Sequence, residues 1–515
     1  MGFRNDEEVI IGASECKFPR VYFVGPFGGR VSFASQQRRV LNLIWALTKK
    51  GILPKRGARV AVVGGGIAGV TAAAALLCRS CDVHLYEREG EVLTLQSLAH
   101  HRTVHPSINF WPEEALSWTT EFPFLDWYAD DAVRVAKVIE RDWKGFEDAY
   151  NRFESVEGWL AGLHVNTPVS GFDDDDGRPV VLVNKKPHDT YDIVFVTTGF
   201  GFERNLGDEE QKRYWTQDEI DLLSLRTGLK IAVSGTGDGG VIDALRLTYT
   251  KFMEHEVALK LIQLENKDLL ADQIRDIEAK AQDIVDANER SVHYAAEYGK
   301  IAVDRSLRAR AMLPDLAPDK IPVTLIGPRP HPFDLSSAPI HKLALAYSLA
   351  KKRIVYLQGK LTRLDKWVLT PPAGAPYEVS FDRIVVRHGA DAPATTFLGE
   401  TEAKKLEAAQ RMIGDFLPSN DVPASDFYAN QRIYPPRPTP GFAMRRLMPA
   451  NEFLKRFGLN AELRRCDDGE YVFLATKSRA PVKNAEYLPS TVFGIELIRS
   501  REIDEVADPL LGVSS

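Results

Sequence analysis

The sequence is poor in cysteine and carries no excess of positive charge. Four cysteines in 515 residues are too few for a disulfide framework, which is typical of a protein from a reducing compartment. A formal net charge of −6 argues against a nucleic-acid partner held by contacts to phosphates. Residues 1–8 are too charged for a signal peptide. We therefore expect a cytoplasmic protein that binds no nucleic acid.

Membrane-spanning and metal-binding patterns are missing as well. The stretch from Ala58 to Cys78 is long and nearly uncharged, but three consecutive glycines after a β-branched run fit a strand and loop better than a membrane span. His100, His101 and His105 stand close together without an accompanying carboxylate cluster. We expect neither a membrane segment nor a metal site.

What the sequence does contain is a glycine-rich turn between a buried strand and a helix of small residues. The run Val60–Val63 predicts the strand, and Gly64, Gly66 and Gly69 follow it. Glycines at this spacing let the backbone turn tightly, let a pyrophosphate approach, and let the next helix pack on the sheet. The following strand ends at Glu87, whose carboxylate suits ribose hydroxyls. The combination predicts a dinucleotide site; a glycine turn without a ligand is the alternative.

A second unit of the same kind lies further along the chain. A predicted strand over residues 191–196 runs into Thr198 and Gly199, and another over 230–234 leads into a second glycine turn followed by a helix. The glycines of this turn are Gly235, Gly237 and Gly240. Two phosphate-binding turns imply two dinucleotide sites.

These motifs resemble those of the two-dinucleotide-binding-domain flavoproteins, which include thioredoxin-reductase-like enzymes, flavin monooxygenases, and ornithine or lysine N-hydroxylases. The resemblance covers residues 59–393, and some segments are similar to those of bacterial FAD/NAD(P)-binding proteins. It implies that the first turn holds FAD, that the second holds NADPH or NADH, and that Thr197, Thr198 and Gly199 belong to the crossover between the domains. The motifs specify a superfamily rather than a reaction, so no catalytic residue is assigned.

The second unit departs from the usual pattern of this group. A charged, helix-prone stretch over residues 253–310 delays its second strand, and we interpret this stretch as an inserted helical pair. The strand at 322–327 is followed by Arg329, and in NADPH-using relatives an arginine here holds the 2′-phosphate. A solvated arginine in a proline-rich turn is an equal alternative. For His388 we expect a hydrogen-bonded loop position.

Most members of the group also bring a Gly-Asp pair near the C-terminus to the ribityl chain of FAD. After residue 400 we find no strand followed by such a pair, because Gly414-Asp415 lies in a helix-like run. In the loop after Glu87, Arg102 is a candidate for the pyrophosphate and His105 for a place near the flavin. The Cys78–Cys81 spacing resembles a redox motif but falls at the far end of the first nucleotide-binding helix.

We therefore expect an α/β fold with two Rossmann-like domains. The expected parts are an N-terminal extension packed on the FAD domain (1–55), the FAD domain (56–225), an NAD(P)-binding domain with the helical insertion near 253–310 (226–395), a connector with a proline-rich linker (396–440), and a small C-terminal α/β domain (441–515). The last part favours contacts with a protein partner or a second copy.

Three functions fit this organisation. The first is an FAD-dependent oxidoreductase that uses NAD(P)H and passes electrons to O₂ or a small organic molecule. The second is a dinucleotide-binding sensor or scaffold without rapid turnover, and the third is an oxidase whose substrate reduces flavin directly. The second glycine turn favours the first over the third. Function has to be argued from the site rather than from the fold.

Overall fold

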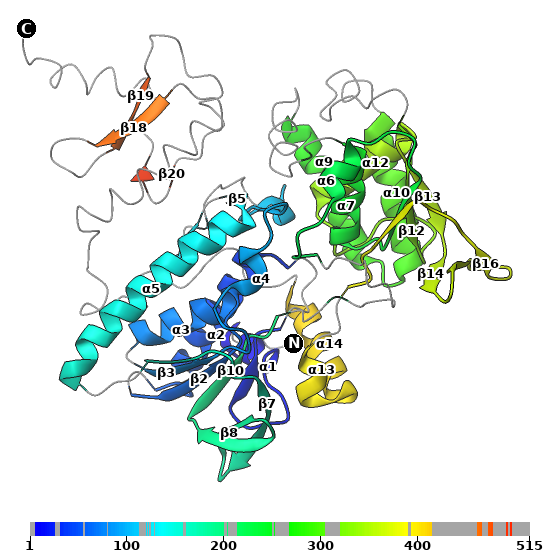
Figure 1. The fold of residues 1–515 in the computed structure, drawn as a ribbon. Coiled ribbons are helices and arrows are strands. Elements are labelled where there is room, and N and C mark those ends of the chain that lie inside the picture. Colours follow the sequence, from blue (N-terminus) through cyan, green and yellow to red (C-terminus); the bar gives the residue numbers. More distant parts are fainter. Residues whose placement is uncertain are drawn as a thin grey trace, which may run out of the picture.

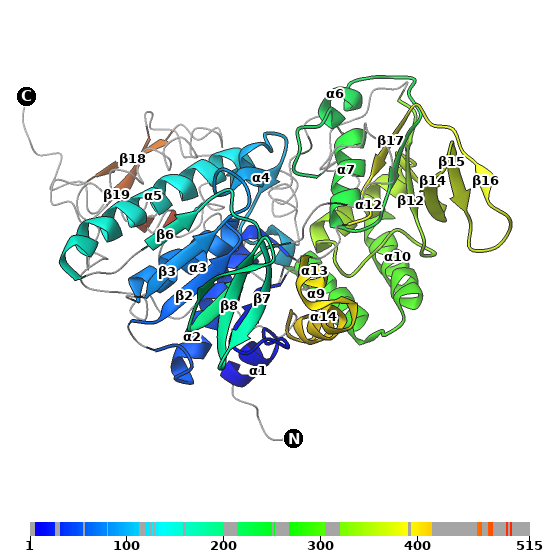
Figure 2. The same cartoon turned by 60° about the horizontal axis from the view of Figure 1, so that its bottom comes forward.

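Two parallel sheets, one in each half of the chain, organise this computed structural model (Figure 1; Figure 2). The structure describes residues 6–25, 31–54, 57–79, 81–112, 129–157, 161–199, 214–249, 267–303, 320–389 and 393–414, a few single residues between these ranges, and four short strands after residue 460. Helices flank both sheets, as parallel strands require crossover connections. The predicted α/β class with two Rossmann-like units is confirmed.

The first sheet has five parallel strands in the order β1-β10-β2-β3-β6. Their bounds are Val21–Phe23, Ile193–Val196, Arg59–Val63, Asp82–Tyr86 and Ala161–His164. The crossover helices are α2 (Phe33–Lys49), α3 (Ile67–Cys78) and α5 (Ala132–Glu157). Because β1 pairs with β10, the N-terminal segment contributes an edge strand to the sheet as well as a covering helix.

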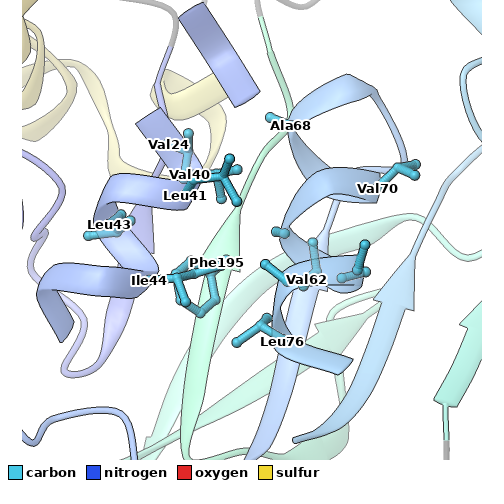
Figure 3. Close-up of a cluster of buried hydrophobic side chains, with 14 of the residues drawn as sticks. Val24, Val40, Leu41, Leu43, Ile44, Val62, Ala68, Val70, Leu76 and Phe195 are labelled. Carbon is cyan, nitrogen blue, oxygen red and sulfur yellow. The ribbon is translucent and has the colours of Figure 1, made fainter. Parts of the chain in front are cut away.

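The helices α2 and α3 cover one face of this sheet side by side (Figure 3). Every residue of α3 is buried, since small side chains let it lie close to the strands. Ser32 caps α2: its hydroxyl accepts a hydrogen bond from the Ser35 N–H at 3.1 Å, and the Ser35 hydroxyl accepts one from the Ser32 N–H at 2.8 Å. The helix ends before Gly51, which has a φ of 71°.

The opposite face is covered by an antiparallel sheet and by the returning chain. The sheet consists of β7 (Val169–Asp175), β8 (Arg178–Val183) and β9 (Lys186–Thr190), and the returning helices are α13 (Pro393–Leu398) and α14 (Glu400–Gly414). Lys17 Nζ donates to the Leu398 carbonyl at 3.0 Å, and Gln410 Nε2 donates to the Phe23 carbonyl at 2.9 Å. Residues 393–414 thus pack on the first unit as helices. Gly414 is the last residue of α14, and Asp415 lies outside the described residues.

The second unit is built on four parallel strands in the order β13-β12-β11-β17. Their bounds are Ile354–Gln358, Val323–Gly327, Ile231–Ser234 and Arg383–Val386, and the flanking helices are α7 (Asp238–Thr248) and α12 (Pro339–Ala350). An antiparallel sheet of β14 (Lys360–Arg363), β15 (Trp367–Thr370) and β16 (Tyr377–Glu378) extends from its outer side (Figure 1).

The predicted helical insertion is present as α9 (Lys267–Asp283) and α10 (Ala287–Val303). A fully buried ion pair holds it to α12: Lys342 Nζ lies 2.9 and 3.0 Å from the two carboxylate oxygens of Glu278. The Tyr294 and Tyr298 hydroxyls donate to the same carboxylate at 3.0 and 2.6 Å. The insertion is therefore part of the core of the second unit.

The remaining elements are short. They are α1 (Asp6–Gly12), α4 (Thr94–Ser97), β4 (Thr103–Val104), the 3₁₀ turn η1 (Ile108–Phe110), β5 (Asp130–Asp131), α6 (Ile220–Ser224), β18 (Ala461–Arg465), β19 (Val472–Thr476), β20 (Thr491–Val492) and β21 (Ile495–Glu496). Only these last four strands, paired as two antiparallel hairpins, represent the expected C-terminal domain, and its other residues lie outside the described ones. Among the described helices, none is both long and apolar enough to cross a bilayer.

Candidate dinucleotide-binding sites

The first glycine turn joins β2 to α3, and both its ends are tightly closed by backbone. Gly64 has a φ of +108°, and a Cβ atom there would lie 2.9 Å from the Thr197 carbonyl oxygen. A Cβ atom at Gly69 would overlap the Gly64 carbonyl oxygen. These two positions need glycine for internal reasons, because any side chain would push the turn away from its neighbouring strand or helix.

Gly66, the middle glycine of this turn, has different surroundings. A Cβ atom at this position would have no heavy atom within 4 Å. Gly66 is also the N-cap of α3, and no side chain caps the helix there. The first N–H groups of α3 and the positive end of its dipole favour an anion at this point. The turn therefore offers a pyrophosphate the space and the donors that it needs, so the residues present fit the phosphates of FAD.

Glu87 follows β3 and lies against the first turn. Its Oε2 accepts a hydrogen bond from the Gly65 N–H at 2.6 Å, and its Oε1 accepts one from the Glu89 N–H at 2.9 Å. These two bonds fix the carboxylate one strand away from Gly66. A ribose attached to a pyrophosphate at Gly66 would find an acceptor for its hydroxyls here.

The predicted crossover residues also lie beside the first turn. Thr197 donates its hydroxyl to the Gly64 carbonyl at 2.8 Å, which holds the end of β10 to the turn. The Thr198 Cα would lie 3.2 Å from a Cβ atom at Gly64, and Gly199 has a φ of +64°. The structure thus brings seven predicted residues to one edge of the first sheet: Gly64, Gly66, Gly69, Glu87, Thr197, Thr198 and Gly199.

The second glycine turn, between β11 and α7, repeats the geometry of the first. Gly235 has a φ of +127°, and a Cβ atom there would overlap the Arg387 carbonyl oxygen. A Cβ atom at Gly240 would overlap the Gly235 carbonyl oxygen. Gly237 is the N-cap of α7, and the only heavy atom that its Cβ would approach among the described residues is Ser336 Oγ, at 4.0 Å. The middle glycine is again the open one.

The charge at the second turn differs from that at the first. Asp238 is the first residue of α7, and its Oδ1 accepts hydrogen bonds from the Ala338 N–H at 3.0 Å and from His341 Nδ1 at 2.7 Å. Burial opposes ionisation, but the charge and hydrogen bond of His341 and the Ala338 N–H together lower the pKa of Asp238. A carboxylate therefore stands at the helix end that a phosphate would use.

Arg329 lies just after β12, at the predicted place. Its guanidinium pairs with the Asp334 carboxylate, and its side chain is 29% exposed. The Tyr356 hydroxyl donates to the Arg329 carbonyl at 2.5 Å and fixes the backbone. A 2′-phosphate would have to compete with Asp334 for this guanidinium, so the proposed contact stays a prediction.

The guanidinium of Arg102 is bound by other residues of the protein. Its side chain is buried, and its guanidinium binds the Asp243 carboxylate at 2.5 and 3.1 Å and the Tyr214 carbonyl at 2.9 Å. These contacts give Arg102 a structural role between the two units, and they disfavour the interpretation that it holds a pyrophosphate.

Asp243 is the centre of a buried network of charges that the sequence analysis missed. Arg387 Nε donates to its Oδ2 at 2.7 Å, and Arg246 donates to its Oδ1 at 3.1 Å. Arg246 also binds Asp218 at 3.0 Å. The loop of Arg102, the helix α7 and the end of β17 therefore meet at one carboxylate. Two charged residues at i and i+3 inside an otherwise apolar helix were the available signal.

His105 and His388, two histidines considered in the sequence analysis, both hydrogen-bond to other groups of the protein. His105 Nδ1 accepts hydrogen bonds from the Ser107 and Ile108 N–H groups at 3.2 and 3.1 Å, which shapes the turn before η1 and gives no support to a place near the flavin. His388 hydrogen-bonds to Ser234 Oγ at 2.7 Å, as a loop histidine was expected to do. In the described part of the chain, no group of three potential ligands could hold a metal ion.

Comparisons with known proteins agree with this picture. Residues 62–108 match the family model described as an NAD(P)-binding Rossmann-like domain, and this range contains the first turn and Glu87. No curated protein matches the chain. The match supports a Rossmann-like nucleotide-binding unit around the first turn.

Several solved structures are similar to this chain at low identity. T. acidophilum thioredoxin reductase shares 14% identity, with a TM-score of 0.33 and coverage of 67% of this chain and 80% of that one. OTEMO in complex with FAD and NADP shares 11%, with a TM-score of 0.38 and coverage of 88% and 98%. Steroid monooxygenase bound to NADP shares 13%, with a TM-score of 0.35 and coverage of 66% and 72%.

Proposed function

We propose that this chain is an FAD-dependent oxidoreductase in which NAD(P)H bound by the second unit reduces FAD bound by the first. The observation that carries the proposal is the repeated geometry of the two glycine turns. In each turn the first and third glycines are closed by backbone, while the middle one is open at the N-terminus of a helix. Open space and free N–H donors at the same point are what a dinucleotide pyrophosphate requires.

The residues of the first unit have distinct parts in this proposal. Gly66 and the start of α3 would hold the pyrophosphate, Glu87 a ribose, and Gly199 would lie along the flavin half. In the second unit Gly237 would face the nicotinamide dinucleotide and Arg329 its 2′-phosphate. Bound flavin supplies the hydride and electron chemistry, and the protein supplies position and charge.

O₂ or a small organic molecule is favoured over a disulfide as the electron acceptor. Cys78 and Cys81 lie at the end of α3 opposite to Gly66, and both thiols are buried. Burial raises the pKa of each thiol to about 12, so neither is a thiolate near neutral pH. The described cysteines therefore do not support a thiol relay.

A sensor or scaffold that binds dinucleotides without rapid turnover is the second candidate. Asp238 favours it, because its carboxylate occupies the helix end where the second pyrophosphate would bind. Such a protein would hold flavin in the first unit but would react slowly with reduced nicotinamide.

The visible spectrum of the purified protein, recorded anaerobically before and after addition of NADPH or NADH, separates these functions. A flavin band that bleaches within seconds supports the oxidoreductase. A stable flavin band supports the sensor, and a protein with neither bound nor bindable flavin contradicts both.

Two matched variants assign the nucleotides to their turns. Gly66→Asp should lower the FAD affinity by about 100-fold or more, because it fills the open position and places a negative charge against the pyrophosphate. Gly237→Asp should leave the flavin bound and abolish its bleaching by NAD(P)H. Flavin retained at wild-type affinity by Gly66→Asp would remove the first turn from the cofactor site.

A further inference from the structure

The order of the strands in the first sheet determines where each part of a bound dinucleotide would lie along its carboxyl edge. The strand order β3, β2, β10, β1 places Glu87, the turn of Gly66, Gly199 and Gly25 along this edge in that sequence. At about 4.8 Å between strands, the distance from β3 to β1 is about 14 Å. A dinucleotide with its adenosine ribose at Glu87 and its pyrophosphate at Gly66 must therefore extend its other half over β10 and β1.

The helix that follows β1 begins at this same edge. Since β1 is parallel to β10 and β2, α2 starts beyond their carboxyl ends and runs back beside α3. Figure 3 shows the two helices next to each other, with Ile44 of α2 beside Phe195 of β10. The start of α2 therefore lies on the side of the edge that the flavin half would reach.

A buried glutamine, Gln36, stands at this end of α2. The Gln36 side chain is 8% exposed, and its Nε2 is buried without a hydrogen-bond partner among the described residues. It lies one helical turn before Val40 and two before Ile44, so it shares their sheet-facing side at the end nearest the carboxyl edge. A buried amide donor without a partner is costly, and a bound acceptor would satisfy it.

The neighbouring glutamine shows how a satisfied amide looks in the same helix. Gln37 Oε1 accepts a hydrogen bond from Trp127 Nε1 at 2.7 Å, and its Nε2 donates to the Leu125 carbonyl at 3.1 Å and to Thr71 Oγ1 at 3.2 Å. Gln37 thus has a purely structural role. The difference between the two amides singles out Gln36 as the residue available to a ligand.

We propose that the Gln36 side-chain amide donates a hydrogen bond to the flavin half of bound FAD, either to a ribityl oxygen or to a carbonyl of the ring. The proposal rests on the proposed function, since it requires FAD at the first turn. Among the described residues, β1 occupies the edge of the sheet beside β10. The unit of β1 and α2 then serves the end of the cofactor that a C-terminal Gly-Asp pair serves in the flavoproteins that the sequence resembles.

Binding of FAD and of ADP to flavin-free protein tests this inference. ADP carries the adenosine and pyrophosphate without the flavin half. Gln36→Leu should lower the FAD affinity about tenfold through the lost hydrogen bond and leave the ADP affinity unchanged. The absorption maxima of bound FAD should shift as well, which a merely structural change at a distance would not cause.

Asn42→Leu is the matched control. Asn42 is 3% exposed and its Nδ2 also lacks a partner among the described residues, but it lies about 9 Å further along α2. The Asn42→Leu variant should bind FAD and ADP with the affinities of the wild type. Equal losses of FAD and ADP, a parallel loss in Asn42→Leu, or wild-type FAD binding in Gln36→Leu would overturn the role of Gln36. Wild-type protein that binds neither ligand would instead overturn the proposed function, and this inference with it.

Discussion

In both glycine turns the first glycine lies against the carbonyl of the residue that follows a neighbouring strand, the third lies against the carbonyl of the first, and the middle one faces open space. The residues that follow differ. The helix α3 continues with Ile67 and carries no charged residue, whereas α7 begins with Asp238 and carries Asp243 and Arg246 further along. Backbone geometry therefore sets where a dinucleotide can lie, while the charges around each turn set how strongly it binds.

The two units are joined at the buried charges of α7, beside the second turn. The buried side of α3 is covered by α2 and the sheet, so the first turn is completed within its own unit. The buried Asp243 carboxylate of α7 is satisfied by Arg102, across the junction from the first unit, and by Arg387, which follows β17 in the second unit. The second turn thus depends on the junction, because Arg387 also provides the carbonyl that closes Gly235.

The largest effect should come from removing the carboxylate at the junction. Asp243→Ala leaves three buried guanidinium groups without their shared partner, and the loss of one side of a buried ion pair costs about 3–5 kcal/mol. We expect unfolding in denaturant to separate into two transitions, one for each unit. Asp272→Ala is the control, since its ion pair with Arg275 is exposed and should contribute about 0.5 kcal/mol.

The pH dependence of this variant follows from the same contacts. Although burial opposes ionisation, Arg102 and Arg387 strongly lower the pKa of Asp243 in the folded state. The carboxylate therefore stabilises the fold above its ordinary pKa, and this stabilisation disappears only as the pH falls through the lowered one. The stability difference between wild type and Asp243→Ala should persist in mild acid. A difference that vanishes near pH 6 would contradict the buried network.

The turns could be predicted from the sequence because their signals are local. Gly64, Gly66 and Gly69 lie within six residues, and Glu87 follows at the end of the next strand, so spacing alone places them. The strand β1 is only three residues long, and its partner β10 comes some 170 residues later in the chain, which no local pattern reveals.

The junction could not be predicted for a related reason. Arg102 and Asp243 are 141 residues apart, and each carries a charge that is usually solvated on a surface. The sequence therefore offered Arg102 as a ligand for the pyrophosphate, whereas the fold uses it within the protein. Buried ion pairs between distant segments depend on the topology, and only the structure shows them.

An intermediate effect is expected where a 2′-phosphate would bind. Arg329→Ala should lower the affinity for NADPH about tenfold and leave the affinity for NADH unchanged, because only NADPH carries the additional phosphate. Asp334→Asn should raise the affinity for NADPH relative to that for NADH, since it frees the Arg329 guanidinium from its present partner. Titration of both nucleotides against each variant measures these ratios. Equal changes for the two nucleotides would rule out a contact between Arg329 and the 2′-phosphate.

The smallest effect is expected from a substitution that makes the second turn more like the first. Asp238→Asn keeps an oxygen that can accept from the Ala338 N–H and removes the negative charge at the start of α7. Because a charge at a helix N-terminus contributes about 0.3–1 kcal/mol, we expect NAD(P)H to bind about two- to fivefold more tightly and the fold to lose a similar amount of stability. FAD binding at the first turn should not change. Weaker NAD(P)H binding in this variant would show that Asp238 supports the second site, through His341 and Ala338, more than its charge opposes it.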